Sequence, residues 1–223
     1  ELLERLKKHA GEIHFLIRRG IYFAHRDLNW ILDEYEKGNK FFLYTGRGPS
    51  ENLHLGHLMP MVMTKWLQEK FDTNLYIQFT DDEKFLFKQN LELENAKKIA
   101  YQNMLDLIAL GFKPQKTKFI LDTENIKTLY PLALKVAKKL NFSTAKAVFG
   151  FTNENNVGQI FYTSIQSAPC FIENRPCLIP LGIDQDPHFR VTRDIAPKLG
   201  FYKPAILHGM MMPSLSGPSG KMS

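Results

Sequence analysis

The sequence of 223 residues has few cysteines, no long apolar run and no internal repeat. Its two cysteines, Cys170 and Cys177, form no C-x-x-C pair, so they indicate neither a disulfide framework nor a zinc site and favour the reducing cytoplasm. No apolar run approaches the ~18 residues of a membrane-spanning helix and no stretch resembles a signal peptide, so no membrane partner is expected. The P-loop and the G-x-G-x-x-G dinucleotide fingerprint are both absent, which excludes those two ways of binding a nucleotide.

The composition favours a single large α/β domain, with or without a small appendage. Hydrophobic residues make up 44% of the chain, enough for a packed core, and 23% of residues are charged. A net charge of +6 favours polyanionic partners, but only weakly, because the excess is spread along the chain. The seven histidines do not form a set of metal ligands, so no resident metal is expected.

Hydrophobic periodicity divides the chain into alternating helices and strands. Helical spacing predicts helices over residues 1–36 (with Asp27 as an N-cap inside this range), 54–70, 92–110, 123–140, 143–149, 158–171 and 184–199. Short apolar runs predict strands over residues 41–44, 74–79, 118–121, 177–183 and 205–211. Strands alternating with helices predict right-handed crossovers and a parallel sheet. The tail 214–223 has three glycines or prolines at its centre and is expected to be mobile.

The segment 41–57, FFLYTGRGPSENLHLGH, is the centre of the predicted chemistry. A buried strand leads through a loop with glycine and proline into the start of an apolar helix, a geometry that gathers free backbone N–H groups around an anion. His54, His57 and Arg47 add side-chain donors at the same place. A histidine pair around a glycine is by itself more often structural. Its position at a helix start after a strand favours a nucleotide-phosphate site.

A second motif lies about 165 residues later, where GPSGKMS places Lys221 in a glycine-rich stretch. Alone, this stretch would be an ordinary surface loop. Together, HLGH and KMS resemble the signature pair of class I aminoacyl-tRNA synthetases. The longer strings YTGRGPSENLHLGH, IQFTDDEK, SIQSAP and GIDQDPHFRVTRD resemble the tryptophanyl-tRNA synthetases of eukaryotes and archaea, and this resemblance extends from about Gly20 to Ser223.

The resemblance implies a fold, a reaction and partners. The fold would be a Rossmann-type parallel α/β sheet with helices on both faces and a helical insertion between its halves. Tryptophan and ATP, taken as Mg-ATP, would give tryptophanyl-adenylate, and the tryptophanyl group would then pass to tRNA(Trp). The substrate carboxylate is already ionised at neutral pH, so the reaction needs positioning and charge neutralisation rather than a general base. The family also implies a homodimer in the cytoplasm.

Site residues are carried over from the resemblance position by position. The catalytic residues would be His54, His57 and Lys221. The nucleotide would contact Thr45, Gly46, Arg47, Gly56, Lys84, Met210, Met211, Met222 and Ser223. The amino acid would contact Tyr44, Gln78, Glu83, Gln166 and Gln185. No metal ligand is expected.

Some of these residues have competing explanations. An indole N–H is only a donor, so a tryptophan pocket needs a buried acceptor, which the ends of two adjacent strands could offer through Tyr44 and Gln78. Tyr44 could equally be a strand-end aromatic residue. Asp184 and Asp186 are as well explained as helix caps as they are as ligands. The methionines at 210–212 are more simply explained as core packing.

The resemblance also divides the chain. Residues 1–40 would be an N-terminal helical segment, and residues 41–223 the catalytic domain, with the insertion at about 92–171, which would also form the dimer interface. Both ends are expected to be cut: the family's anticodon-binding domain, the rest of its KMSxS loop and an N-terminal strand pair do not occur in this sequence.

Three other functions compete with tryptophan activation. A tyrosyl-tRNA synthetase shares the scaffold, although its pocket usually places a carboxylate where this sequence has Gln78. A small nucleotidyltransferase also uses an HxGH motif, but would not need GIDQD or KMS. The chain could finally act only as a binding module.

Overall fold

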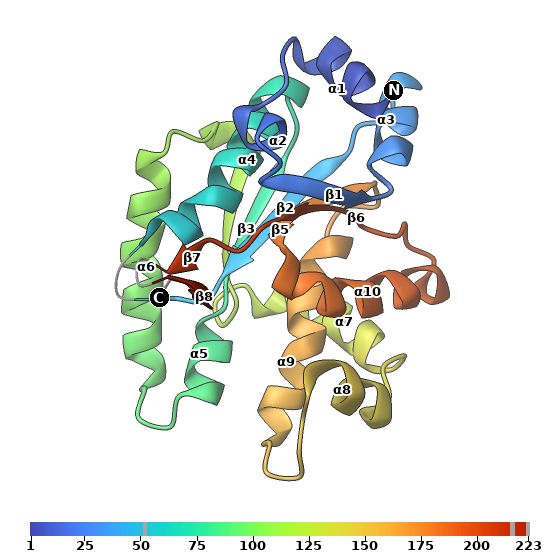
Figure 1. Cartoon of the computed structure of the whole chain (residues 1–223). Helices are drawn as coiled ribbons and strands as arrows, with labels where there is room; N and C mark the ends of the chain where they lie inside the picture. Colours follow the sequence, from blue (N-terminus) through green and yellow to red (C-terminus); the bar gives the residue numbers. More distant parts are fainter. Residues whose placement is uncertain (51–52, 215–216, 222–223) are drawn as a thin grey trace.

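The computed structural model contains a six-stranded sheet, in the order β1-β6-β5-β2-β3-β4, with helices packed on both faces (Figure 1). It describes residues 1–50, 53–214 and 217–221, and side chains as far as residue 212. The strands are β1 (Tyr22–Arg26), β2 (Phe42–Arg47), β3 (Leu75–Phe79), β4 (Thr117–Leu121), β5 (Cys177–Gly182) and β6 (Ala205–Gly209). The helices are α1 (Leu2–Ala10), α2 (Phe15–Arg18), α3 (Leu28–Glu36), α4 (Leu55–Phe71), α5 (Asp81–Phe87), α6 (Leu93–Ala109), α7 (Ile126–Ala137), α8 (Phe142–Phe149), α9 (Val157–Ser167) and α10 (Asp186–Ile195), with 3₁₀ turns at Pro114–Lys116, Ala168–Phe171, Ile183–Gln185 and Ala196–Leu199.

The prediction of helix throughout residues 1–36 is wrong at Tyr22–Arg26, which form β1. This strand pairs antiparallel with β6 at the edge of an otherwise parallel sheet. Arg26 fixes it by donating to the Asp186 carboxylate at 2.8 and 2.9 Å. Residues 1–40 are therefore not all helical, and part of them belongs to the main sheet. Asp27 does occupy the N-cap position of α3, but its carboxylate accepts from Arg193 at 2.6 Å instead of capping the helix.

Alternation along β2 places successive side chains in two separate cores. Phe41 and Leu43 face the core that includes α1, α3, α4 and α6, whereas Phe42 and Tyr44 face the core that includes α7, α9 and α10. Both faces of the sheet are thus covered, as predicted for a Rossmann-type fold. The range 92–171, predicted to be a helical insertion, supplies α6 to α9 but also contains β4, which pairs with β3.

The sheet opens between β2 and β5. Their ladder consists of the pairs Phe42–Cys177 and Leu43–Leu178, although both strands continue for several residues beyond it. From β2 the chain proceeds to β3 and β4 on one side, and then crosses over to β5 and β6 on the other. In open α/β sheets such a reversal leaves a crevice at the carboxyl ends of the strands, where ligands bind.

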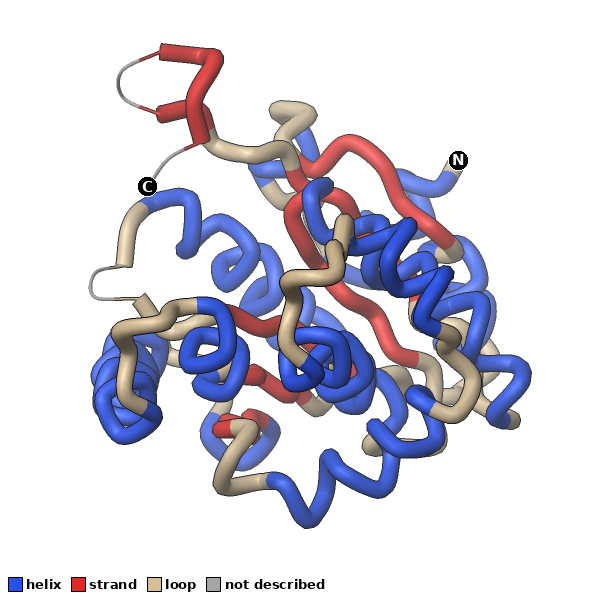
Figure 2. Tube along the Cα trace, turned by 90° about the horizontal axis from the view of Figure 1, so that it is seen from below, coloured by secondary structure: helices blue, strands red, loops and turns tan. Residues whose placement is uncertain are grey.

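Part of the glycine-rich tail is a two-stranded sheet, β7 (Pro213–Ser214) with β8 (Gly217–Lys221). Figures 1 and 2 both show this hairpin beside the start of α4, apart from the six-stranded sheet. None of the helices within the described part of the chain combines the length and the apolarity needed to cross a bilayer.

A buried histidine makes stability depend on pH. His188 on α10 contacts the rings of Phe149 and Phe189, and burial lowers its pKa to about 4. In the unfolded chain this histidine binds a proton near pH 6.5. The contribution of neutral His188 to the free energy of unfolding is therefore fully present above that pH and is lost as the pH falls towards 4. We expect this residue alone to lower the free energy of unfolding by about 2 kcal/mol between pH 7 and pH 5. Urea unfolding of His188→Asn at both pH values should show a smaller loss than the unchanged chain; an equal loss would contradict this.

Candidate active site

A cleft of about 370 Å³ lies at the carboxyl ends of the central strands, within the size range of small-molecule sites. Of the predicted site residues, those that line it are Tyr44, Thr45, Gly46, Arg47, His54, Gly56, His57, Gln78, Glu83, Lys84, Gln166, Gln185, Met210 and Met211. The backbone of Lys221 pairs with Pro213, but its side chain is not described, and Met222 and Ser223 lie outside the described residues. Segments more than 160 residues apart in sequence thus meet at one place.

The HLGH motif lies at the start of α4, with His54 at the N-cap position. The imidazole rings of His54 and His57 stack with their centroids 3.6 Å apart. Gly56 permits this arrangement, because a Cβ there would lie 3.1 Å from the His54 ring. Two imidazoles and the positive end of a 17-residue helix dipole therefore point into the cleft.

Arg47, at the end of β2, is a buried cation that forms no salt bridge among the described residues, and the carboxylate of Asp106 attracts it only at longer range. Its side chain is 9% exposed, its Nη2 donates to Ser50 Oγ, and its Nη1 has no hydrogen-bond partner. Burial lowers the pKa of this guanidinium to about 10. A buried charge is costly unless it is paired, so this position suits an anionic ligand.

Gly48 is a site residue that the sequence interpretation missed. A Cβ there would lie 2.4 Å from Lys84 Cε and 3.0 Å from Glu83 Oε2, so no larger residue fits without moving these side chains. Glu83 Oε2 also accepts from Thr80 Oγ1 at 2.6 Å. The second glycine of TGRGPS was the available signal, since it follows a strand end by one residue.

Tyr44 and Gln78 meet at the floor of the cleft, as predicted from adjacent strand ends. The Tyr44 hydroxyl lies 2.5 Å from Gln78 Oε1 and 2.9 Å from the Gln166 carbonyl oxygen. Gln78 Nε2 donates to both Asp122 oxygens, at 2.8 and 2.9 Å, and this leaves Oε1 facing Tyr44. The single Tyr44 hydroxyl proton thus faces two acceptors, Gln78 Oε1 and the Gln166 carbonyl oxygen, so one of them lacks a donor. Burial raises the pKa of Tyr44 well above its ordinary value, which keeps this proton on the phenol oxygen.

The GIDQDP segment is only partly in the cleft. Gln185 Oε1 accepts from Gln166 Nε2 at 3.2 Å, and Asp184 lines the cleft. Asp186 instead binds Arg26 and His208, and the Arg26 hydrogen bonds, followed by that of His208, lower its pKa to about 2. Asp186 therefore joins β1, β6 and α10 and does not act as a side-chain cap.

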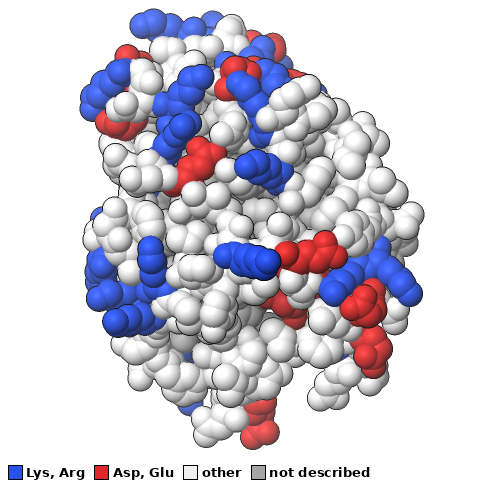
Figure 3. All heavy atoms as spheres, turned by 180° about the vertical axis from the view of Figure 1, so that it is seen from behind, with Lys and Arg blue, Asp and Glu red and all other residues white. Residues whose placement is uncertain are grey.

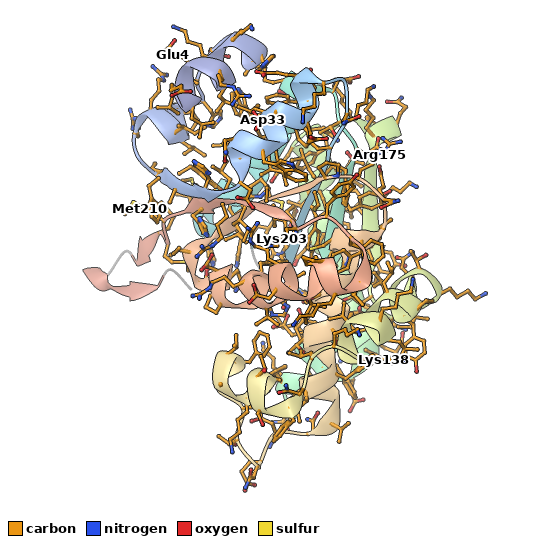
Figure 4. All side chains as sticks on the ribbon, turned by 90° about the vertical axis from the view of Figure 1, so that its right-hand side faces the viewer. Glu4, Asp33, Lys138, Arg175, Lys203 and Met210 are labelled. Atoms are coloured by element: carbon orange, nitrogen blue, oxygen red, sulfur yellow. The ribbon has the colours of Figure 1, made fainter. Side chains whose placement is uncertain are left out.

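The methionines after β6 do not form core packing, which corrects that interpretation. Met210 is 56% exposed, and Met210, Met211 and Met212 all line the cleft. Figure 4 shows Met210 on the side of the molecule from which the hairpin projects, at the opposite end of the sheet from Arg175. Within the described residues no group of three or more histidine, cysteine or acidic side chains could hold a metal ion.

Residues 36–223 match the family model described as tRNA synthetases class I (W and Y). The chain is 52% identical to the tryptophan–tRNA ligase of Saccharolobus solfataricus and 55% identical to that of Pyrococcus furiosus, and in each case all of the chain aligns, with 59% and 58% of the relative. The chain therefore spans about three fifths of these relatives' length.

Solved structures agree with the curated relatives. Tryptophanyl-tRNA synthetase from Plasmodium falciparum superposes with a TM-score of 0.94 at 44% identity, over 97% of this chain and 65% of that one. The enzyme from Encephalitozoon cuniculi, solved bound to tryptophan, gives 0.93 at 40% identity, over 99% of this chain and 68% of that one.

Proposed function

The chain belongs to the class I tRNA synthetases of the tryptophan and tyrosine type, and from this membership we propose that it activates tryptophan with ATP and takes part in charging tRNA(Trp). The main support for the proposal is that the buried oxygens around Tyr44 and Gln78 can accept more hydrogen bonds than the one Tyr44 hydroxyl can donate. An indole N–H is a donor only and would supply the missing hydrogen. A site built to bind such a donor rejects analogues without it strongly, because its own buried groups are then unpaired.

The reaction that we propose needs no base from the protein. A carboxylate oxygen of tryptophan attacks the α-phosphorus of ATP, an O–P bond forms, and the bond to pyrophosphate breaks. His54, His57 and Arg47 would bind the phosphates and ribose while negative charge shifts to the leaving group. Lys84 and Lys221 would bind the carboxylate or phosphate groups, and Thr45, Gly46, Gly56, Met210, Met211, Met222 and Ser223 would shape the nucleotide site.

The substrate ammonium needs hydrogen-bond acceptors. Glu83, Gln166 and Gln185 line the cleft, and all three have side-chain oxygens. The names of the curated relatives favour tryptophan over tyrosine. They also give no support to a cofactor-adenylating nucleotidyltransferase.

We propose that magnesium enters with ATP as part of the substrate. The described residues offer no cluster of metal ligands, so the ion would be held by the triphosphate itself. The charge of this complex is then balanced by the cationic side chains already at the cleft.

A cytoplasmic location fits the free thiols of Cys170 and Cys177, and fractionation of expressing cells tests it.

For tRNA, the surface gives only a general indication. The net charge of +6 favours binding to a polyanion, but Figure 3 shows lysine and arginine on one face in several separate groups, with acidic residues among them. We therefore assign no single basic patch to the acceptor stem. The KM for tRNA(Trp) in the charging reaction should be lower in low salt than in high salt.

We propose a homodimer through the range 92–171. Leu105 and Ile108 of α6 are 62% and 55% exposed, and α7 exposes Tyr130 and Leu134. Exposed apolar side chains of this size suit a protein interface better than solvent. Light scattering on the Leu105→Glu chain should show a monomer if α6 forms the interface, and an unchanged dimer would contradict this.

Pyrophosphate exchange tests the proposed function. With labelled pyrophosphate, this chain should form labelled ATP when tryptophan is present, and at least 100-fold less with phenylalanine, which has no donor for the buried acceptors. Exchange that depends on tyrosine and not on tryptophan would overturn the assignment. Exchange without any amino acid dependence would favour a nucleotidyltransferase instead, and failure to bind either amino acid would leave only a binding module.

A further inference from the structure

Two carboxyl groups lie behind Gln78, and neither has a place in the proposed chemistry. Asp122 follows the end of β4 and is 1% exposed, and Gln78 itself is fully buried. Asp82, on α5, is hydrogen-bonded to Asp122, and its Oδ1 accepts from the Glu83 N–H at 2.8 Å. The chain Gln78–Asp122–Asp82 thus connects the indole acceptor with the helix that carries Glu83.

The direction of these hydrogen bonds decides which end of the Gln78 amide faces the substrate. An amide can turn over and exchange its oxygen for its NH₂ group. Both Asp122 oxygens accept from Nε2, so Oε1 is held towards Tyr44. If Asp122 instead donated a proton to Gln78, the amide would turn and present NH₂ to the indole N–H, where two donors would meet.

Asp82 removes that alternative. Two carboxyl groups in contact cannot both be ionised at little cost, so the pair holds one proton between them. Desolvation and the neighbouring carboxylate raise the pKa of Asp122 well above its ordinary value, and desolvation raises that of Asp82 to about 6. The two carboxyls share this proton, and both Asp122 oxygens accept from Gln78 Nε2, so they remain acceptors for Gln78.

We propose that Asp122, which shares a hydrogen bond with Asp82, is a positioning residue that fixes the Gln78 amide and so sets the preference of the cleft for a substrate side chain with an N–H donor. This rests on the proposed function. It assigns the specificity for indole to a pair of residues that do not touch the ligand. Sequence reasoning did not single out either residue for this purpose, since each lies outside the HLGH and KMS motifs.

Equilibrium binding to this chain tests the proposal without the full reaction. Calorimetry would compare tryptophan with 3-benzothienylalanine, in which sulphur replaces the N–H. Asp122→Leu removes the acceptor for Gln78, and we expect it to reduce the preference for tryptophan at least fivefold. Asp122→Asn should keep the preference, because its carbonyl accepts from Gln78 while its NH₂ donates to Asp82, as the protonated acid does.

A neighbouring carboxylate provides the matched control. Asp81 is also fully buried on α5 and its charge acts on Asp82 and Asp122, but it accepts from the Thr123 N–H at 3.2 Å and forms no hydrogen bond with Gln78. Asp81→Asn should therefore leave the preference unchanged. If Asp122→Leu does not fold, Asp82→Ala is the second variant, and it should also reduce the preference because the Asp122 proton is freed towards Gln78.

The outcomes separate this proposal from the function on which it rests. An unchanged preference in Asp122→Leu or Asp82→Ala would overturn the inference alone, and so would an equal loss of preference in Asp122→Asn and Asp122→Leu. Absence of tryptophan binding by the unchanged chain would overturn both the proposed function and this inference. A reduced preference in Asp122→Leu, retained in Asp122→Asn and Asp81→Asn, supports it.

Discussion

Replacement of Arg47 by leucine is expected to weaken the binding of ATP to this chain about 100-fold, the effect of losing charge-assisted hydrogen bonds of ~1.5–3 kcal/mol in a buried site. The same change should leave the free energy of unfolding in the absence of ATP unchanged or slightly increased. Arg47 has a buried Nη1 without a hydrogen-bond partner and forms no salt bridge among the described residues, since Asp106 attracts it only at longer range, so removing the charge relieves a cost of burial. Calorimetry with ATP and urea unfolding measure the two quantities.

Arg26 is the matched control for this prediction. It is also an arginine at a strand end, but it donates two hydrogen bonds to the buried Asp186. Arg26→Leu should therefore lower the free energy of unfolding by about 2 kcal/mol, since it leaves Asp186 with His208 as its remaining partner. If Arg47→Leu destabilised the chain as much as Arg26→Leu, or left ATP affinity intact, Arg47 would be a structural residue.

Replacement of Gln78 by leucine should weaken tryptophan binding about 100-fold, because the indole N–H loses its acceptor and Asp122 loses its donor. The affinity for ATP measured alone should change little, since the proposed function assigns Gln78 to the amino acid and not to the nucleotide. Tyr44→Phe should have a smaller effect of about tenfold, because Gln78 Oε1 and the Gln166 carbonyl both remain as acceptors.

Gln68 on α4 shows whether such a loss reflects general damage. It is a second fully buried glutamine, which donates to Thr117 Oγ1 at 2.8 Å and accepts from the Lys113 N–H at 3.1 Å, away from the cleft. Gln68→Leu should lower the free energy of unfolding without changing tryptophan affinity. A comparable loss of affinity in both variants would refute the specific role of Gln78.

Features with a local origin could be predicted from the sequence. The strand, loop and helix start at residues 41–57 depend on an apolar run, a glycine-rich turn and a helix, each visible within a few residues. Parallel strands end at one edge of the sheet, so the convergence of Tyr44, Gln78 and the helix start followed from strand order.

Features held by distant contacts could not be predicted. The residues of β1 form a strand because of β6 and Asp186, 160 or more residues later, whereas their own sequence, YFAHR, does not alternate apolar and polar residues. Met210 is exposed because the chain leaves the sheet there, although methionine is usually buried. Asp122 could be read as the last residue before a turn, and its contact with Gln78 depends on the register of β3 and β4.

A crystal structure of this chain with tryptophan and a non-hydrolysable ATP analogue tests the central claim most directly. We expect the indole nitrogen within hydrogen-bond distance of Tyr44 Oη and Gln78 Oε1, with the triphosphate against Arg47 and the start of α4. An indole bound elsewhere, or a cleft that stays without tryptophan at saturating concentration, would contradict it.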